Sequence, residues 1–228
     1  MEDVVRQESL EEKVVRLEKE NQEKDEKIAI FEESIRLLIE EQKTLVIKAY
    51  YDGLTRLRNI HGLEKDIDQI FKRKDEEKAH EERKKSKEGQ EDNICVIMVD
   101  IDKFKLVNDK YGHLNGDKIL REVSDRLSES IRDTDVIARC GGEEIIILLV
   151  GASEYEAGKK AERLRKLIEK TPFNLRESGQ IDLTVSIGVT FGDNNSDPEK
   201  LRKEADDALY QAKEGGRNRV EIYKNNNE

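Results

Sequence analysis

Two acidic segments of this chain combine residue types that bind divalent cations and phosphates. The apolar run 94–99 leads directly into Asp100 and Asp102, and Gly141-Gly142-Glu143-Glu144 directly precedes a second apolar run, 145–150. Each run has the length and composition of a buried strand that is bounded by a turn. Carboxylates beside bare glycine backbone suit Mg²⁺ that carries a nucleotide phosphate, because hard cations prefer oxygen ligands and glycine lets a phosphate approach closely. The alternative is a hairpin with solvated acids at its tip.

The composition narrows the class of protein. The chain has 228 residues and a formal net charge of −10, and 41% of its residues are charged. This balance disfavours a nucleic-acid-binding surface, although metals can neutralise a nucleotide polyphosphate locally. No apolar run approaches the roughly 20 residues that span a bilayer, and the N-terminus lacks the pattern of a signal peptide. The two cysteines, Cys95 and Cys140, give no disulfide framework. We therefore expect a cytoplasmic protein with no membrane span and no nucleic-acid partner.

A heptad repeat runs through residues 4–49, which contain neither Gly nor Pro. Counted with Val14 at position a, nine of the twelve a and d positions are apolar. Such a sustained pattern is typical of a coiled coil, and Asn21 at an a position favours two parallel strands. Lys24 and Gln42 interrupt the apolar seam, which suggests two competing registers.

We therefore expect residues 1–49 to be a signalling and dimerisation helix of a parallel homodimer. A single amphipathic helix packed on a globular body is the alternative. Residues 10–21 also resemble leucine-zipper dimerisation sequences, which leaves open whether the segment is native or engineered.

The remaining residues, 50–228, alternate between helical and strand patterns. We expect helices at 60–71, after 117, at 154–170 and at 198–214, strands at 94–101, 183–190 and 220–223, and a hairpin across 141–142. The polar segment 73–92 should be a solvated helix extension or a mobile loop. Strands and helices in this order predict an α+β sandwich of ferredoxin-like type, preceded by the coiled-coil helix.

The motifs in residues 50–228 resemble those of a known family. They occur in the order and spacing of GGDEF-type diguanylate cyclase domains, which implies the palm fold of the nucleotidyl cyclases. The matching motifs are Asp52-Gly53-Leu54-Thr55-Arg56-Leu57-Arg58-Asn59, Asp100-Ile101-Asp102-Lys103-Phe104-Lys105, Asn108-Asp109-Lys110-Tyr111-Gly112-His113, Gly116-Asp117, Gly141-Gly142-Glu143-Glu144, Ser186-Ile187-Gly188-Val189, and Ala208-Leu209-Tyr210-Gln211-Ala212-Lys213 with Gly216-Arg217-Asn218 after it.

The resemblance implies an enzyme that joins two GTP molecules into cyclic di-GMP and releases two pyrophosphates. It implies that Asp100 and Glu143 bind Mg²⁺, two ions per GTP with Mn²⁺ as a possible substitute, helped by the backbone carbonyl of Ile101. Glu144 then has a supporting catalytic role beside Asp100 and Glu143. Converging carboxylates repel one another unless divalent cations compensate, which agrees with this assignment.

The resemblance also implies a set of substrate-binding residues. The backbone amides of Lys103 and Phe104 would bind the β- and γ-phosphates. The side chains of Lys213 and Arg217 would also bind phosphate. Asn108 and Asp117 would form hydrogen bonds with the guanine edge. The alternative for Asn108 is a turn residue and for Asp117 a helix N-cap.

A second site is implied by Arg132-Asp133-Thr134-Asp135, an R-x-x-D pattern five residues before Gly141. It resembles the site where cyclic di-GMP inhibits members of this family. Arg132 and Asp135 would bind the product, and Arg163 matches an arginine that a facing domain contributes. Ordinary surface charge is the alternative for each arginine.

Two residues depart from the family pattern. Ile145 replaces the usual Phe, and Cys140 stands where Tyr is common. We expect Ile145 to point into the core, so that the change affects packing and rate more than the type of reaction. Three other functions remain as alternatives: a degenerate domain that binds GTP or cyclic di-GMP, a coiled-coil scaffold, and a cyclase that makes an adenine-containing dinucleotide.

Overall fold

The computed structural model describes residues 9–81, 93–175, 179–193 and 196–224, and the side chains of 72–81 are not described. The chain divides into two compact units, residues 1–48 and 49–228, and each is considered by itself. Within the described ranges, no helix is both long enough and apolar enough to cross a membrane.

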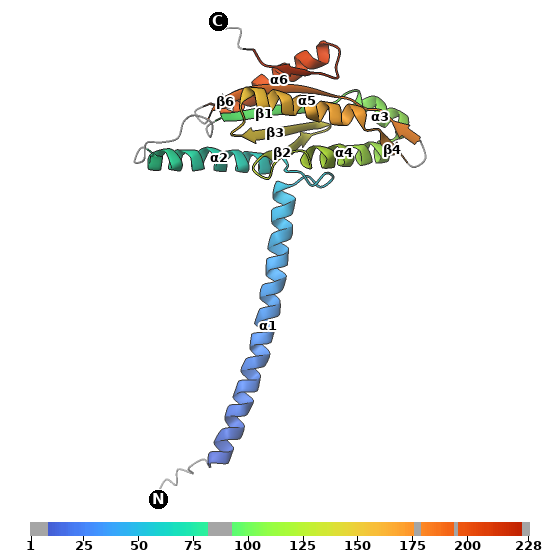
Figure 1. Ribbon diagram of the computed structural model, residues 1–228. Helices are drawn as coiled ribbons and strands as arrows, with labels where there is room; N and C mark the ends of the chain where they lie inside the picture. Colours follow the sequence, from blue (N-terminus) through green and yellow to red (C-terminus); the bar gives the residue numbers. More distant parts are fainter. Residues whose placement is uncertain (1–8, 82–92, 176–178, 194–195, 225–228) are drawn as a thin grey trace, which may run out of the picture. The chain divides into compact units, whose positions relative to one another are not determined.

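The first unit consists of one long helix, α1 (Leu10–Tyr50, 41 residues), whose last two residues belong to the second unit (Figure 1). Ser9 and Glu12 begin it as a capping box, because Ser9 Oγ accepts from the Glu12 amide and the Glu12 carboxylate accepts from the Ser9 amide. No residue of α1 is buried, and apolar seam residues such as Ile28 and Leu38 are 53% and 64% exposed. The helix thus presents the apolar stripe of a coiled coil.

A five-stranded mixed sheet forms the centre of the second unit. Its strands, in spatial order, are β2 (Val136–Gly141), β3 (Glu144–Val150), β1 (Asn93–Ile101), β6 (Val185–Asp193) and β7 (Val220–Ile222). Neighbouring strands are antiparallel except β6 and β7. The central strand β1 is an almost unbroken buried run, as expected for a strand covered on both faces.

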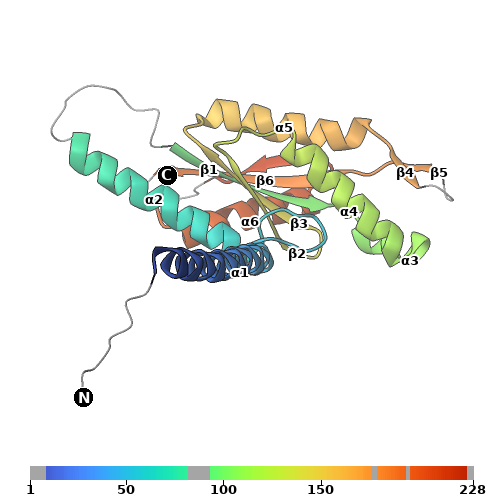
Figure 2. The same cartoon turned by 90° about the horizontal axis from the view of Figure 1, so that it is seen from below.

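Alternate residues of the central strands point to opposite faces, and different helices cover each face. Helices α4 (His113–Ser128) and α5 (Glu154–Lys170) cover one face, over core residues that include Ile97, Ile147 and Ile187. Helices α2 (Ile60–Glu81) and α6 (Pro198–Glu214) cover the other face, over residues that include Val96 and Ile146 (Figure 2). Ile145 is 1% exposed in the core under α4 and α5, which confirms that it points inward, and Cys95 is fully buried in the same core.

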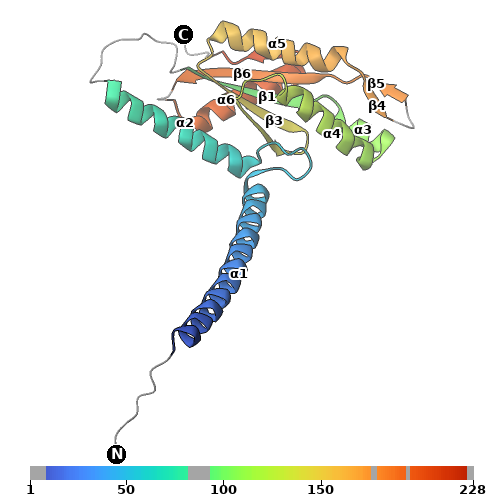
Figure 3. The ribbon, with the colours of Figure 1, turned by 60° about the horizontal axis from the view of Figure 1, so that its bottom comes forward.

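The topology confirms the ferredoxin-like prediction. The series β1-α4-β2-β3-α5-β6 is a β-α-β-β-α-β unit, and its strands lie in the order β2-β3-β1-β6. The helices α2 and α6 and the strand β7 are additions to this unit. The structure also contains a short helix, α3 (Phe104–Tyr111), and a hairpin of β4 (Phe173–Leu175) with β5 (Gly179–Ile181), which the sequence patterns did not predict (Figure 3).

Helix ends were predicted well where a cap marks them. α5 has the predicted bounds, because Ser153 and Glu156 form a capping box before its apolar stripe. α6 also has the predicted bounds, with Asp197 as N-cap and Pro198 in the first turn. α4 begins earlier than predicted, at His113, and α2 extends beyond the predicted residue 71 to Glu81. The part of the polar segment from 82 to 92 lies outside the described residues.

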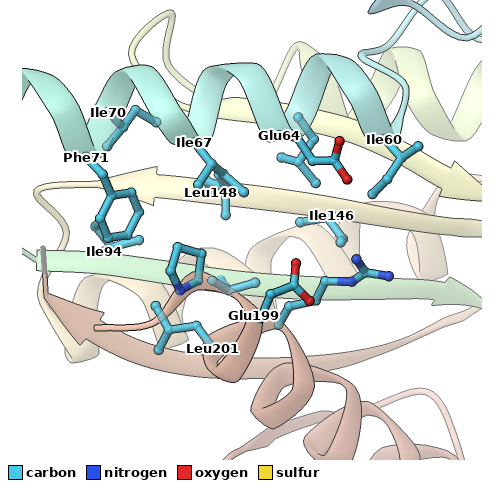
Figure 4. A pocket seen from close by; sticks show the side chains of 14 residues that line it. Ile60, Glu64, Ile67, Ile70, Phe71, Ile94, Ile146, Leu148, Glu199 and Leu201 are labelled. Carbon is cyan, nitrogen blue, oxygen red and sulfur yellow. The ribbon is translucent and has the colours of Figure 1, made fainter. Parts of the chain in front are cut away.

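A small apolar crevice of about 30 Å³ lies between α2, the sheet and α6. Figure 4 shows Ile67, Ile70 and Phe71 of α2 directed toward Ile94 and Leu148 of the sheet. The crevice therefore belongs to the packing of α2 on the core that contains Val96 and Ile146.

Candidate active site

Strand pairing brings the acidic residues of the two motifs together. Asp100 is the second-last residue of β1, and the antiparallel register with β3 places it opposite Glu144. Glu143 precedes Glu144 in the turn from β2 to β3. The carboxylate of Asp100 thus lies at the same edge of the sheet as those of Glu143 and Glu144, which follow about 43 residues later in the sequence. Glu143 and Glu144 do lie at the tip of the β2–β3 hairpin, but both are half-buried, and Asp100 beside them is 6% exposed.

Asp100 lies in an unfavourable setting for a carboxylate. Burial raises its pKa to about 6, and the negative charges of Glu143 and Glu144 act in the same direction. Lys213 opposes this shift, because its Nζ lies 2.7 Å from Asp100 Oδ2. The ionised form of Asp100 is therefore stabilised by a neighbouring positive charge, which the Lys213 ammonium group provides.

The same features fit Mg²⁺. A divalent cation would neutralise the repulsion between these neighbouring carboxylates. The buried residue Ile101 ends β1 directly after Asp100, so its backbone carbonyl lies close to them in sequence. Among the described residues, no group of three or more His, Cys, Asp or Glu side chains could by itself hold a metal ion. Two carboxylates and a backbone carbonyl would leave the other positions to phosphate oxygens and water, which is how Mg²⁺ is usually bound with nucleotides.

The glycine turn leaves open space beside the acids. Gly141 and Gly142 have φ values of 151° and 53°, so glycine is favoured at both. A Cβ atom built on either glycine meets no atom within 4 Å. The turn is braced by Arg139, whose Nε and Nη2 donate to the carbonyl oxygen of Gly142 at 3.0 and 2.7 Å.

A second binding feature is the N-terminus of α3. Lys103 precedes this helix with a left-handed backbone (φ 58°), and no side chain caps the helix. Helix N-termini bind phosphate through their unpaired backbone amides. The amide positions at Lys103 and Phe104 are thus available for phosphate three and four residues beyond Asp100, and the Phe104 side chain is buried.

The two candidate phosphate-binding cations lie at the end of α6. Lys213 is in the last turn of α6, where it reaches Asp100, and Arg217 follows the helix end with an exposed side chain. Arg217 Nη1 also lies 3.4 Å from the Lys213 carbonyl oxygen. The structure therefore brings Lys213 to the acidic edge directly and Arg217 to its vicinity.

Asn108 and Asp117 lie on two contacting helices, α3 and α4. Asn108 Oδ1 rests against Gly116, since a Cβ on that glycine would be only 1.8 Å away. Both alternative readings were wrong: Asn108 is inside α3, and the N-cap of α4 is Gly112 rather than Asp117. Both half-buried side chains remain available for a ligand.

Residues of the expected product site lie in the loop between α4 and β2 and on α5. Arg132 and Arg163 line one surface depression of about 1320 Å³, and both are exposed. Asp135 is turned back on its own loop, where its Oδ2 accepts from the Arg132 amide at 3.0 Å. Arg163 Nη2 and Lys160 both donate to the Ser130 carbonyl oxygen, so α5 is tied to this loop.

Two residues near the acids have roles that the sequence did not reveal. Arg139 was not singled out, although it holds the glycine turn and pairs with Asp52 at 2.9 Å. Asp102 is 7% exposed and accepts hydrogen bonds from the hydroxyls of Thr184 and Ser186, both at 2.6 Å. The signal for Asp102 was an acidic residue directly after the buried strand β1.

Comparison with known proteins agrees with this geometry. Residues 49–219 match the family model described as diguanylate cyclase, GGDEF domain. The diguanylate cyclase DosC of Escherichia coli (strain K12) is 42% identical over 173 residues, which cover 76% of this chain and 35% of DosC. The chain therefore spans about a third of the length of this curated relative.

Solved structures extend the likeness to both units. The coiled coil and GGDEF domain of DgcB from Caulobacter crescentus, in complex with c-di-GMP, has a TM-score of 0.76 at 25% identity and covers 87% of this chain and 98% of its own. The active GGEEF domain of a diguanylate cyclase from Vibrio cholerae has a TM-score of 0.55 at 32% identity and covers 64% of this chain and 89% of its own. Because the family model matches most of the chain, this protein belongs to the GGDEF domain family of diguanylate cyclases.

Proposed function

We propose that the protein is a diguanylate cyclase that condenses two GTP molecules into cyclic di-GMP with release of two pyrophosphates. The observation that carries the proposal is the convergence of Asp100, Glu143 and Glu144 beside an open glycine turn and the uncapped N-terminus of α3. This arrangement offers metal ligands and phosphate donors in one place. Residues 50–228 form the catalytic domain in this proposal, and residues 1–49 the dimerisation helix.

The reaction needs positioning and charge neutralisation more than covalent chemistry from the protein. Mg²⁺, when bound by Asp100, Glu143 and the Ile101 carbonyl, would neutralise phosphate charge and activate the attacking 3′-oxygen. Lys213 is then released from Asp100 and joins Arg217 at the phosphates. Glu144 supports the same cluster from the first position of β3.

The β- and γ-phosphates bind at the start of α3 in this proposal. The backbone amides at Lys103 and Phe104 donate to them, and the helix dipole adds a favourable field. The α-phosphate is thereby held near the acidic edge, where it is attacked by the 3′-hydroxyl of the second GTP.

Guanine binds between α3 and α4. Asn108 and Asp117 offer an amide and a carboxylate, which can satisfy the guanine edge and leave adenine with unpaired groups. An unpaired buried polar group costs about 1–3 kcal/mol. This difference favours GTP over ATP.

One domain holds one GTP, so two domains must face each other. The a and d residues of α1 supply the contact: Val14, Leu17, Ile35 and Leu45 are 44–60% exposed in the single chain. A seam of this length is stable when a second copy covers it. We assign the occupant as a parallel second copy of this chain, with activity depending on the register of the coiled coil.

Product inhibition is proposed at Arg132, Asp135 and Arg163. Arg132 and Arg163 line one depression and present two exposed guanidinium groups, which suit the phosphates of cyclic di-GMP. The hydrogen bond from the Arg132 amide to Asp135 holds the loop in one conformation.

The proposal is tested by incubating the protein with GTP and Mg²⁺ and separating the products by chromatography. Cyclic di-GMP and pyrophosphate should form in a ratio of about one to two, and Glu143→Gln should reduce the rate at least a hundredfold. Omitting Mg²⁺ should have the same effect. A protein that binds GTP but forms no cyclic di-GMP would instead be a nucleotide-binding signalling module. In a parallel incubation with equal amounts of GTP and ATP, an adenine-containing product would contradict the guanine assignment.

A further inference from the structure

The turn that carries Arg217 has a strained backbone. Gly216 has φ 112°, and the next two residues, Arg217 and Asn218, both have left-handed values of 64° and 48°. Left-handed conformations are unfavourable for residues other than glycine, and they persist where surrounding contacts determine them. Consecutive strained residues next to a ligand-binding side chain are typical of a clamp.

The backbone of this turn is tied to the acidic strand. Asn218 donates its amide to Asp102 Oδ2 at 3.0 Å, and Arg217 donates its amide to the Ala212 carbonyl oxygen at 3.0 Å. Asp102 is fixed in turn by the hydroxyls of Thr184 and Ser186. Since Asp102 lies two residues after Asp100, the strand that carries the proposed metal ligand also positions the turn that carries Arg217.

The side chain of Asn218 is tied to α5. Its Oδ1 accepts from Arg165 Nη1 at 2.5 Å, and its Nδ2 donates to Glu169 Oε1 at 2.6 Å. Arg165 is 8% exposed and forms ion pairs with Glu162 and Glu169 at 2.9 and 3.1 Å. Hydrogen bonding to Arg165 lowers the pKa of Glu162 to about 2, and hydrogen bonding to Asn218 lowers the pKa of Glu169.

The Oδ1 and Nδ2 atoms of the Asn218 side chain and its backbone N–H therefore all form hydrogen bonds. A residue that only followed the end of α6 would not need three separate partners, one in the turn after β1 and two on α5. Hydrogen bonds to charged partners are stronger than neutral ones, and three of them at different atoms fix the position of Asn218. The group formed by Asp102, Arg165, Glu169 and Asn218 is called the Asn218 clamp below.

We propose that Asn218 is a positioning residue for substrate binding: the Asn218 clamp holds the strained turn so that the Arg217 guanidinium is pre-organised for a nucleotide phosphate. This inference rests on the proposed function. It adds Asn218 and Arg165 to the residues that determine affinity for GTP, although neither needs to touch the nucleotide. Pre-organisation of a binding group raises affinity by reducing the ordering that binding requires.

The test uses Asn218→Gly in the full chain. Glycine adopts the left-handed backbone without strain, so this variant removes the side-chain contacts without forcing a new backbone conformation, and Arg165→Ala removes one of them without changing the backbone of the turn. KM for GTP, and Kd for a non-hydrolysable GTP analogue with Mg²⁺, should rise about tenfold, whereas kcat at saturating GTP should change less than about threefold. Arg165→Ala should have the same effect, and the double variant should be no worse than either single variant, because both act through one network.

Controls separate the possible outcomes. Arg121→Ala, which removes an exposed arginine from α4, should leave KM and Kd unchanged. Asn218→Asp keeps the acceptor for Arg165 and tolerates the left-handed backbone, so it provides a folded test, with a smaller rise in KM, if the glycine variant is unstable. Unchanged KM and Kd with a lowered melting temperature would overturn the proposal and make the clamp purely structural. A wild-type protein that binds no GTP analogue would instead overturn the proposed function.

Discussion

Asp52 and Arg139 are 87 residues apart in the chain, yet their side chains form an ion pair of 2.9 Å. The same guanidinium donates to the Gly142 carbonyl oxygen in the turn before Glu143. Burial opposes the charge of Asp52, but hydrogen bonds from Thr55 and Arg139 outweigh it and hold the pKa of Asp52 below its usual value. The start of the second unit is thus linked through one arginine to the turn of the candidate active site.

Replacing Arg139 should therefore affect both stability and turnover. Arg139→Ala leaves Asp52 and the Gly142 carbonyl without this donor, and we expect a loss of about 1–3 kcal/mol in the free energy of unfolding. We also expect kcat to fall at least tenfold, because the turn loses its brace. Denaturant unfolding and the rate of cyclic di-GMP formation measure the two effects. Arg121→Ala is the exposed control, and equal stability and rate in both variants would contradict this role.

Gly116 should be required for guanine binding. In Gly116→Ala the new Cβ would lie 1.8 Å from Asn108 Oδ1 and 3.3 Å from Phe104 Cζ, so the Asn108 side chain has to move. We expect KM for GTP to rise at least tenfold while α4 remains folded, since alanine favours a helix more than glycine does.

The matched control for this change is Gly158→Ala in α5. Its Cβ would meet only Ile222 Cδ1 at 3.7 Å, an ordinary contact. This variant should be as active as wild type and equally or more stable, by up to about 1 kcal/mol. Circular dichroism melting and KM for GTP distinguish the two variants, and a Gly116→Ala protein with the wild-type KM would show that Asn108 does not read the substrate.

Nucleotide binding should weaken in mild acid because of Asp100. Burial raises the pKa of Asp100 from 3.8 to about 6, and only its ionised form can bind a metal. The affinity for the nucleotide with Mg²⁺ should therefore be highest at pH values above this pKa and should decrease by up to tenfold for each pH unit below it. The measurement is Kd for a non-hydrolysable GTP analogue with Mg²⁺ between about pH 5 and pH 7.5, corrected for protonation of the free nucleotide. A corrected Kd that is constant over this range would argue against Asp100 as a ligand.

Product inhibition should depend on Arg132. Arg132→Ala removes an exposed guanidinium from the depression it shares with Arg163, far from Asp100 in sequence and on another element. We expect the inhibition constant for cyclic di-GMP to rise at least tenfold and the initial rate to remain within about twofold of wild type. Rates measured with and without added product test this. Inhibition that persists unchanged in both Arg132→Ala and Arg163→Ala would place the inhibitory site elsewhere.

Local sequence signals were sufficient for most of the fold. The sequence patterns predicted the bounds of α5 and α6, which the structure caps with Ser153 and Asp197, and apolar runs predicted β1 and β3. The helix α3 was missed because the segment after Lys103 was read only as a phosphate-binding turn. The hairpin of β4 and β5 was missed because its strands have three residues each, too short to show alternation.

The site was only partly predictable for a different physical reason. Residues that would touch a ligand occur in motifs, so Asp100, Asn108 and Lys213 could be assigned from the family resemblance. Residues that hold those motifs act through pairs distant in sequence, such as Arg139 with Asp52 and Arg165 with Asn218. A single sequence does not contain these pairings, because they depend on the tertiary fold.

In the proposed function, two chains each contribute one GTP to a shared reaction. Subunit mixing tests this most directly: wild-type protein is combined with an equal amount of Glu143→Gln, and the subunits are randomised by unfolding and refolding together. If both halves of a dimer must be intact, about one quarter of the dimers are active, and the rate should fall to about one quarter of that of an equal amount of refolded wild type. A rate of about one half would show that each subunit acts alone and would contradict the account.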